Sequence, residues 1–361
     1  MFSQFRDREM VGRIAARLSE ASRGVNFRIM HVCGTHEWSI THFGLREMLP
    51  KNVRIVAGPG CPVCVTPGNE IDALSELAAG GKAVVTTFGD VVRVPGNRLS
   101  LSEAKASGGD VRVVYSIADA IKMAKAEKDR EFVHFSIGFE TTAPMAAVEI
   151  IKGVPDNFSI FSSHKLIPPA LEFLLASGVA IDGFICPGHV STIIGAKAYE
   201  GLASSYRKPM VISGFEPLDV MAGVWNIVRQ VKEGAFRVDN EYTRAVRHSG
   251  NEVALASLAK AFEPCETNWR GIGRIPGSGM RLRGSYSGAD ARVKFGMDIP
   301  EGDEMPKGCG CGSVLLGTMS PEECPLFDSG CTPEIPVGPC MVSLEGTCAI
   351  AYKYRKIRSR P

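Results

Sequence analysis

The chain lacks three features: a block of like charge, a long apolar run and an uninterrupted apolar N-terminus. In its 361 residues, 41 Lys and Arg residues face 39 Asp and Glu residues, which leaves a formal net charge of +2. This balance argues against nucleic acid or a membrane surface as the main partner. No window has about 18 uncharged apolar residues in a row, and charges interrupt residues 1–20, so neither a membrane span nor a secretory signal is expected. We therefore expect a cytoplasmic protein.

Several familiar cofactor motifs are also missing. No predicted strand is followed by G-x-G-x-x-G or by G-x-x-x-x-G-K, and the C-x-x-x-C-x-x-C pattern of radical enzymes does not occur. The glycine-rich stretch 271–279 follows no predicted strand, which favours a loop. These absences argue against a dinucleotide site, a P-loop and radical chemistry.

Cysteine, by contrast, is plentiful, with eleven residues. In the reducing compartment that we expect, so many thiols indicate metal ligation or thiol chemistry rather than a disulfide framework. Cys186 and Cys265 stand alone. The others form an early group of Cys33, Cys61 and Cys64 and a late group of Cys309, Cys311, Cys324, Cys331, Cys340 and Cys348. Two sites, far apart in the sequence, are therefore predicted.

Short apolar runs alternate with helical patterns through the first two thirds of the chain. After an amphipathic helix at about 4–22, strands are predicted at 27–32, 53–57, 83–87, 111–115, 132–137, 158–161, 183–186 and 210–213. Helical patterns follow most of them, for instance at 69–79, 117–125, 143–152 and 168–176. This alternation favours an α/β fold with parallel sheets covered on both faces.

The ends of the predicted strands repeat loosely. HVCGTHE (31–37) resembles SIGFETT (136–142), and GPGCPVC (58–64) resembles CPGHVST (186–192). We therefore predict two similar parallel-sheet α/β domains, 1–116 and 117–238, that face each other across a cleft. Residues 239–361 are rich in Gly, Pro and Cys with little periodicity, so this third region needs a cross-linking metal or a larger body to lie on.

Four cysteines of the third region, Cys324, Cys331, Cys340 and Cys348, are spaced C-x6-C-x8-C-x7-C. Four thiolates suit either an iron–sulfur cluster or a tetrahedral zinc ion. This run has no C-x2-4-C knuckle of the kind that zinc sites use, and a cluster is therefore favoured. Cys309 and Cys311 offer a spare pair, so the spacing leaves open which four bind.

The early cysteines occupy two loops. Cys33 follows a predicted strand, where open α/β sheets bind ligands, and shares its loop with His36 and Glu37. A helix starting here and a protonated His36 would both favour the thiolate. Cys61 and Cys64 form a C-x-x-C in a Gly/Pro turn, which is typical of a redox disulfide or half a metal site. Because no second C-x-x-C completes a zinc site, we favour the redox pair over a merely structural turn.

Five stretches in order, CGTHE, GPGCPVC, GFETT, PGHVS and the closing cysteine run, resemble the HypD family of hydrogenase maturation factors over essentially the whole chain. The resemblance implies two α/β domains plus a [4Fe-4S] domain. It also implies a scaffold that assembles the Fe(CN)2CO unit of [NiFe]-hydrogenases together with HypC, and with HypE as the cyanide donor.

The resemblance also implies roles for individual residues. Cys33 would bind the iron of Fe(CN)2CO, Cys61 and Cys64 would relay electrons as a thiol–disulfide pair, and the run from Cys324 to Cys348 would hold the cluster. Side chains in the Gly-rich turns would help to hold cyanide by hydrogen bonds, with Thr141, Thr142, His189 and Ser191 as candidates. Two other classes stay open: a free-standing oxidoreductase that reduces disulfides, and a zinc-stabilised interaction protein.

Overall fold

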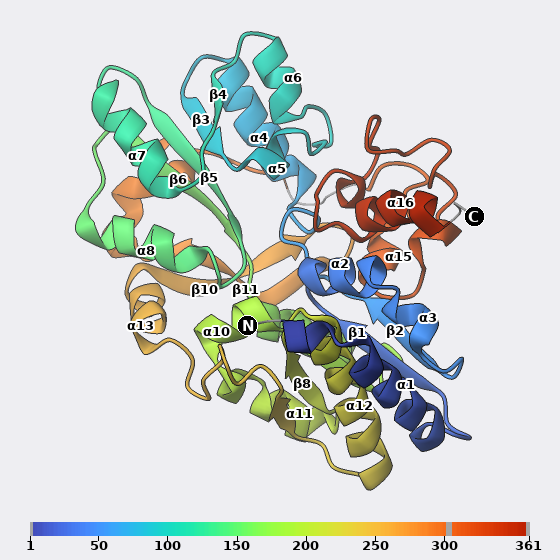
Figure 1. The fold of residues 1–361 in the computed structure, drawn as a ribbon. Helices are drawn as coiled ribbons and strands as arrows, with labels where there is room; N and C mark the ends of the chain where they lie inside the picture. Colours follow the sequence, from blue (N-terminus) through green and yellow to red (C-terminus); the bar gives the residue numbers. More distant parts are fainter. Residues whose placement is uncertain (1–2, 301–304, 359–361) are drawn as a thin grey trace.

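Two parallel β-sheets and one antiparallel hairpin organise the chain (Figure 1). The computed structural model describes residues 3–300 and 305–358. The first sheet has the order β2-β1-β7-β8-β9, with strands β1 (Phe27–His31), β2 (Val53–Ala57), β7 (Gly183–Pro187), β8 (Met210–Ser213) and β9 (Val238–Asn240). The second has the order β4-β3-β5-β6, with strands β3 (Val84–Thr87), β4 (Val111–Val113), β5 (Phe132–Gly138) and β6 (Phe158–His164). The hairpin pairs β10 (Phe262–Trp269) with β11 (Gly273–Leu282).

Helices connect the strands and cover the sheets. The first half of the chain contains η1 (Ser3–Arg6), α1 (Arg8–Ala21), α2 (Gly34–His42), α3 (Leu45–Met48), α4 (Gly68–Ala79), α5 (Gly89–Val92), α6 (Leu101–Ala106), α7 (Ile117–Ala126), α8 (Ala143–Lys152) and α9 (Ile167–Ala176). The second half contains α10 (Gly188–Ile194), η2 (Ala196–Tyr199), α11 (Glu200–Tyr206), α12 (Pro217–Glu233), α13 (Glu252–Ala261), η3 (Gly284–Ala289), α14 (Ala291–Lys294), α15 (Cys311–Leu315), η4 (Pro321–Glu323), η5 (Pro339–Met341) and α16 (Thr347–Arg358). In the described part of the chain, no helix has the length and apolarity needed to cross a membrane.

The predicted α/β architecture is confirmed: two parallel-sheet domains are present, followed by a Cys-rich region. All eight predicted strands form close to their expected positions. Strands β5 and β6 are buried at every residue, as expected for parallel strands covered on both faces. The hairpin was missed because its residues 262–282 contain Pro and several Gly, and a bulge between Cys265 and Thr267 interrupts their alternation.

The sheets group the strands differently from the consecutive segments 1–116, 117–238 and 239–361. Strand β1 pairs with β2 on one side and with β7 on the other, so that Met30 lies opposite both Val56 and Phe184. Strands β3 and β4 belong instead with β5 and β6. The chain thus leaves the first sheet after β2, builds the second, and returns at β7. Local sequence repeats cannot reveal such a return, because pairing partners distant in sequence are selected by backbone hydrogen bonds and shared packing.

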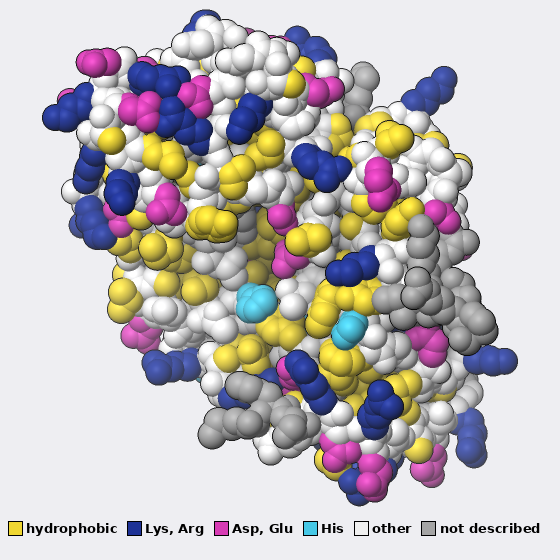
Figure 2. Space-filling view, turned by 45° about the horizontal axis from the view of Figure 1, so that its top comes forward, with side chains coloured by type: hydrophobic (Ala, Val, Ile, Leu, Met, Phe, Trp, Pro, Cys, Tyr) yellow, Lys and Arg dark blue, Asp and Glu magenta, His cyan; other side chains and the backbone are white. Residues whose placement is uncertain are grey.

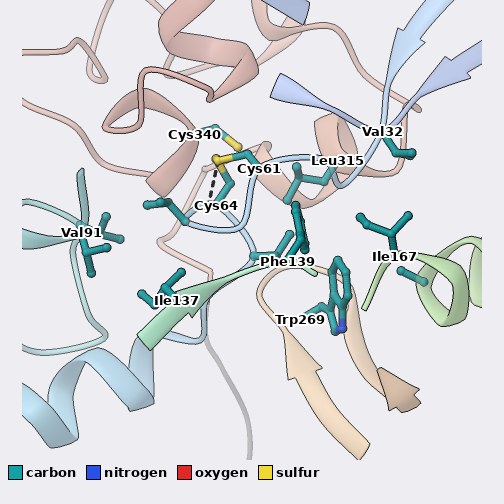
Figure 3. Packing of buried hydrophobic residues seen from close by; sticks show 14 of the residues in the cluster. Val32, Cys61, Cys64, Val91, Ile137, Phe139, Ile167, Trp269, Leu315 and Cys340 are labelled. Carbon is teal, nitrogen blue, oxygen red and sulfur yellow. Dashed lines mark hydrogen bonds between the residues drawn. A yellow bond between two sulfur atoms is a disulfide. The ribbon is translucent and has the colours of Figure 1, made fainter. Parts of the chain in front are cut away.

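Three hydrophobic clusters hold these layers together. One joins α1 and α12 to the first sheet through residues such as Leu18, Ile185 and Val224. A second joins α7 and α8 to the second sheet around Phe132 and Phe158. The third and largest lies between the sheets and includes Phe139, Trp269 and most of the early and late cysteines (Figure 3). The region expected to contain chemistry therefore also forms the central core.

The surface agrees with the balanced charge of the sequence. On the face shown in Figure 2, basic and acidic side chains are interspersed, and hydrophobic side chains lie between them. No large part of this face carries charge of one sign, which fits the argument against a polyanionic partner.

We predict that Ile185→Ala strongly destabilises the protein, because β7 lies at the centre of the first sheet and Ile185 is fully buried. Removing this side chain should lower the free energy of unfolding by about 2–5 kcal/mol in denaturant titrations. Met145→Ala, at a side chain that is 54% exposed, is the control and should change it by less than about 0.5 kcal/mol. Equal losses in both variants would contradict the central position of β7.

Candidate functional site

Cys33 occupies the N-cap of α2, directly after β1, as the sequence predicted. Its side chain is buried, and burial raises the pKa of the thiol to about 11, with the negative charge of Glu345 adding to this effect. Hydrogen bonds from the backbone N–H groups of His36 and Thr35 act in the opposite direction but are weaker. The expectation of a favoured thiolate was therefore wrong. The helix start is present, but desolvation outweighs it.

His36 is buried and neutral. Its Nε2 donates to the carbonyl of Gly214 at 2.9 Å and to that of Ser213 at 3.2 Å, while burial lowers its pKa to about 3. Within the described residues its Nδ1 has no hydrogen-bond partner. The ring cannot supply the positive charge that the sequence analysis assigned to it, because protonation would place an uncompensated charge in the core.

Glu37 belongs to a buried ion pair. Its carboxylate lies 2.6 Å from Arg46 and 2.7 Å from Nε2 of His31, and it accepts a hydrogen bond from Thr41. Although burial alone would raise its pKa, the Arg46 charge and the hydrogen bond with His31 hold the pKa of Glu37 well below its usual range. These contacts tie α2 to α3. The Glu37 carboxylate therefore binds Arg46 and His31, whereas the sequence had predicted that it shares a site with Cys33.

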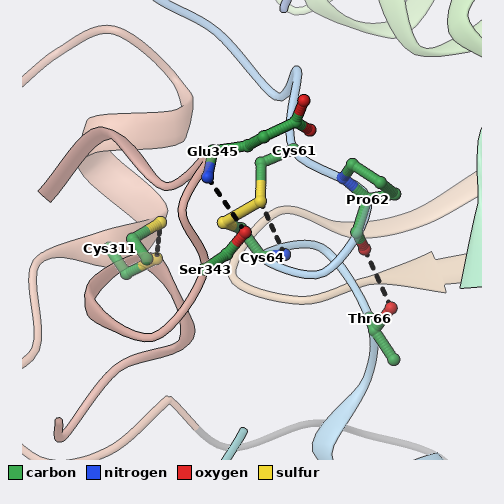
Figure 4. The surroundings of a disulfide bond; sticks show 8 residues. Cys61, Pro62, Cys64, Thr66, Cys311, Ser343 and Glu345 are labelled. Atoms are coloured by element: carbon green, nitrogen blue, oxygen red, sulfur yellow. Dashed lines mark hydrogen bonds between the residues drawn. A yellow bond between two sulfur atoms is a disulfide. The ribbon is translucent and has the colours of Figure 1, made fainter. Parts of the chain in front are cut away.

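Cys61 and Cys64 form a disulfide with a Cα–Cα distance of 5.3 Å (Figure 4). Both residues are buried, and the backbone N–H of Cys64 donates to Sγ of Cys61 at 3.2 Å. The redox-pair interpretation of C-x-x-C requires this proximity, since a disulfide needs closely spaced Cα atoms.

Gly60 brings the disulfide loop against the Cys33 loop. A Cβ atom on Gly60 would lie 2.1 Å from the backbone N of Cys33, a separation that no other residue type permits. The backbone N–H of Gly34 also donates to the carbonyl of Gly60 at 3.1 Å. The loops after β1 and β2 are therefore in direct backbone contact, which places all three early cysteines in one site.

Glu345, from the Cys-rich region, completes this junction. Thr35 donates a hydrogen bond to its carboxylate at 3.1 Å, and a Cβ atom on Gly34 would lie 2.4 Å from the Glu345 Cβ. Figure 4 shows Glu345 beside Cys61. Burial raises the pKa of Glu345. Nothing in the sequence indicated this residue, because its contacts are to residues more than 300 positions earlier.

The six late cysteines share one small cavity: Cys309, Cys311, Cys324, Cys331, Cys340 and Cys348 line it together with Leu326, Phe327, Gly338 and Met341. The Sγ atoms of Cys311 and Cys340 are 2.7 Å apart. Backbone N–H groups of Gly310 and Val337 donate to Sγ of Cys324 and Cys331, each at 3.3 Å. The structure therefore does not set Cys309 and Cys311 apart from the four cysteines chosen by spacing.

The cavity has the donor set of a thiolate-bound cluster. Four cysteine thiolates ligate an iron–sulfur cluster and N–H···S hydrogen bonds tune it, and this cavity offers six thiols and two such bonds. The hydrogen bonds that Cys311 makes with Cys309 and Cys340 lower the pKa of Cys311 and raise the pKa of its two partners. Among the residues that the structure describes, no group of three or more His, Cys, Asp or Glu side chains is arranged to hold a single metal ion. The residues thus fit a cluster by their chemistry.

A comparison with known proteins identifies the family of this chain. The family model HypD, described as "Hydrogenase formation hypA family", matches residues 8–355. The chain belongs to the HypD family. It is 48% identical to a putative hydrogenase expression/formation protein of Methanocaldococcus jannaschii over 97% of this chain and 99% of that protein. It is 44% identical to hydrogenase maturation factor HypD of Rhizobium leguminosarum (99% and 96% covered) and of Cupriavidus necator (99% and 98% covered). Membership supports a role in hydrogenase maturation.

The remaining candidates of this HypD-family chain lie at two places: Thr141 and Thr142 directly before α8, and His189 and Ser191 in the first turns of α10. The Oγ atoms of Thr142 and Ser191 donate to local backbone carbonyls, of Ile137 at 3.3 Å and of Pro187 at 2.8 Å. Thr141 is partly buried in the GFETT loop. His189 is exposed and packs on Phe215 at 4.1 Å, and the Phe215 ring also contacts His36 at 4.8 Å. Only His189 is thus linked to the Cys33 loop by a described ring contact.

Glu140, which no motif reasoning singled out, lies in the same GFETT loop as Thr141. One of its oxygens accepts from the backbone N–H of Ile167 at 2.9 Å, and the other is buried with no hydrogen-bond partner in the described ranges. Burial raises its pKa to about 7. The sequence did contain one sign of this residue, because Glu140 is an acidic residue between an apolar predicted strand and two threonines.

Replacing Gly60 by Ala should disrupt the contact between the two cysteine loops. The added methyl group would overlap the Cys33 backbone, and we expect a loss of about 1–3 kcal/mol of stability together with faster alkylation of Cys33. Gly12→Ala in α1 is the matched control, since its Cβ would meet nothing within 4 Å; it should be neutral or slightly stabilising. A Gly60→Ala protein as stable as wild type would show that the loops can separate freely.

Proposed function

We propose that this chain is a scaffold on which the Fe(CN)2CO unit of [NiFe]-hydrogenases is assembled, with iron held by Cys33. The observation that carries the proposal is one buried cluster that contains the Cys61–Cys64 disulfide and most of the cavity cysteines, with the Cys33 loop in backbone contact with the disulfide loop. Figure 3 shows Cys340 beside this disulfide. A thiol ligand, a two-electron thiol pair and a set of cluster ligands are the parts that assembly of a redox-active iron unit requires.

Cys33 is suited to bind iron only when its proton is removed. Its thiol is protonated at neutral pH because of burial, and a thiolate is the form that binds metal. The Glu345 carboxylate accepts a hydrogen bond from Thr35 at the same loop junction, and we propose it as the group that takes up that proton. A soft thiolate suits an iron that carries cyanide and carbon monoxide, and the unit itself is the cargo of this site.

The other cysteines supply redox support in this proposal. When bound in the cavity, a [4Fe-4S] cluster would provide single electrons. Cys61 and Cys64 accept two electrons and two protons when their disulfide opens, and their place in the shared core keeps both thiols out of bulk water. HypC as the partner in a complex and HypE as the cyanide donor complete the proposal, as the family resemblance implies.

Cys33→Ser should abolish the infrared bands of bound cyanide and carbon monoxide after anaerobic co-expression with the maturation partners. A hydroxyl is a poor ligand for such iron, whereas the late cysteines should keep their own cluster, because Cys33 is not among the residues that line their cavity. Cys265→Ser, at a half-buried cysteine of β10, is the control and should keep the bands. Full-strength bands in the Cys33 variant would exclude this cysteine as the iron ligand.

Cys324→Ala and Cys331→Ala should each remove the brown colour of an iron–sulfur cluster, since both sulfurs face the cavity and accept backbone N–H bonds. We propose Cys340 and Cys348 as the other two ligands, so their variants should also be colourless, whereas Cys309→Ala and Cys311→Ala should stay brown. Iron and sulfide analysis with visible absorbance measures this. If the Cys340 variant is brown and the Cys309 variant is colourless, Cys309 rather than Cys340 is a cluster ligand. If the wild-type protein is colourless and contains zinc, the proposal of an iron–sulfur cluster is wrong.

A further inference from the structure

Two arginines, Arg28 and Arg54, face each other across strands β1 and β2. The strands are parallel, and their register places Arg28 directly opposite Arg54. Opposed residues of neighbouring strands point to the same face of a sheet, so the two side chains leave the sheet next to each other. Like charges in this position repel each other and weaken the pairing of the strands. An anion between the two guanidinium groups would remove this repulsion.

The face that carries the two arginines is turned toward the Cys-rich region. The alternate residues of β1 and β2 pack into the cluster with α1 and α12 on the other face. Met30 and Val56 share the arginine face and are covered by Gly317, where a Cβ atom would lie 2.9 Å from Cε of Met30 and 3.0 Å from Cγ2 of Val56. The Arg28 side chain donates a hydrogen bond to the carbonyl of Gly317. The arginine pair therefore lies where the first sheet meets the Cys-rich region.

A cavity of about 780 Å³ lies at this junction, and both arginines line it. Lys51 adds another positively charged side chain to the lining. Much of the remaining lining is apolar and comes from both sides of the junction, for instance from Leu49, Val314, Met319 and Pro321. The volume is in the range of sites that bind small organic molecules, and an apolar lining with a few charged groups is typical of such sites.

Acidic side chains also line the cavity: Glu37, Glu47, Glu322 and Glu323. Arg46 binds Glu37 at 2.6 Å, and the charges of Glu47 and Glu322 also act on Arg46. Glu323 interacts electrostatically with Arg54, but its carboxylate already accepts a hydrogen bond from the backbone N–H of Ser320 at 2.6 Å. Among the residues that the structure describes, neither Arg28 nor Arg54 forms an ion pair. Their guanidinium groups therefore retain N–H donors for a ligand.

We infer that this cavity binds a small organic molecule with an oxyanion head group, a carboxylate or a phosphate, between Arg28 and Arg54. A guanidinium has five N–H donors in a planar fork that matches the oxygens of either head group. The apolar part of the lining accommodates the carbon body of the ligand, which a bare inorganic anion would leave unused. The inference rests on the arginine pair and the cavity, and it does not depend on the proposed function.

The test is isothermal titration calorimetry of the purified full chain with octanoate, octyl phosphate, inorganic phosphate and uncharged octanamide. At least one of the two anionic eight-carbon probes should bind more tightly than inorganic phosphate and octanamide. Arg54→Gln should weaken this binding at least about tenfold, the effect of losing one charge-assisted hydrogen bond. This side chain is exposed, so its replacement leaves the core intact. Arg17→Gln is the matched control, because this exposed arginine of α1 lies outside the lining; it should bind like wild type.

The comparison of probes identifies the head group, since tighter binding of octanoate assigns a carboxylate and tighter binding of octyl phosphate assigns a phosphate. The inference is overturned if neither of these probes binds at millimolar concentration, or if Arg54→Gln binds them as well as wild type does. Equal affinities for inorganic phosphate and octyl phosphate, without binding of octanoate, would also overturn it, because the apolar lining would then contribute nothing.

The melting temperature of the ligand-free protein tests the repulsion between the two arginines. Without a ligand, Arg54→Gln should melt at the same temperature as wild type or at a higher one, because it removes one of two like charges. With a saturating anionic probe, the order should reverse, since only wild type binds the probe tightly and gains stability from it. A ligand-free Arg54→Gln protein that melts clearly below wild type would contradict the repulsion on which the inference rests.

Discussion

The close backbone contacts around Cys33 are the constraint on which the rest of the site depends. Gly60 touches the Cys33 backbone and Gly34 touches Glu345, in both cases at separations that leave no room for a Cβ atom. Three segments that are far apart in the sequence therefore meet at one point: the loop after β1, the loop after β2 and the Cys-rich region. Because both sheets pack around this point, the chemistry is placed in the central core rather than on a loop at the surface.

Burial raises the pKa of cysteine thiols in both groups, and the hydrogen bonds around them differ. At Cys33, desolvation dominates, and the pKa of the thiol rises to about 11. Around the late cysteines, backbone N–H groups donate to Cys324 and Cys331, and the bonds among Cys309, Cys311 and Cys340 lower the pKa of Cys311 while they raise the pKa of its partners. In the proposed function, the Cys33 thiol must therefore lose its proton before it can bind iron. The disulfide of Cys61 and Cys64 lies in the same core as most of the late cysteines.

The sequence predicted the local structure well and the long-range arrangement poorly. Runs such as 132–137 formed strands because consecutive apolar residues suit a parallel strand buried on both sides. The boundary at residue 116 had no such support, since strand β1 pairs with β7, far along the chain. The environments of His36 and Glu37 could not be predicted from the sequence either. His36 donates to the carbonyls of Ser213 and Gly214, which are distant in the sequence, and Glu37 pairs with Arg46.

By itself, the sequence determined the α/β class, the positions of the main strands, the family and the residues that carry thiols, because each follows from side-chain type and short spacing. Only the tertiary structure decided which strands share a sheet, that all six late cysteines line one cavity, and that Glu345 lies against the Cys33 loop. The physical reason is that pKa, ion pairing and ligand geometry depend on distances through space. Those distances are set when the chain packs, and they join residues that have no local relation in the sequence.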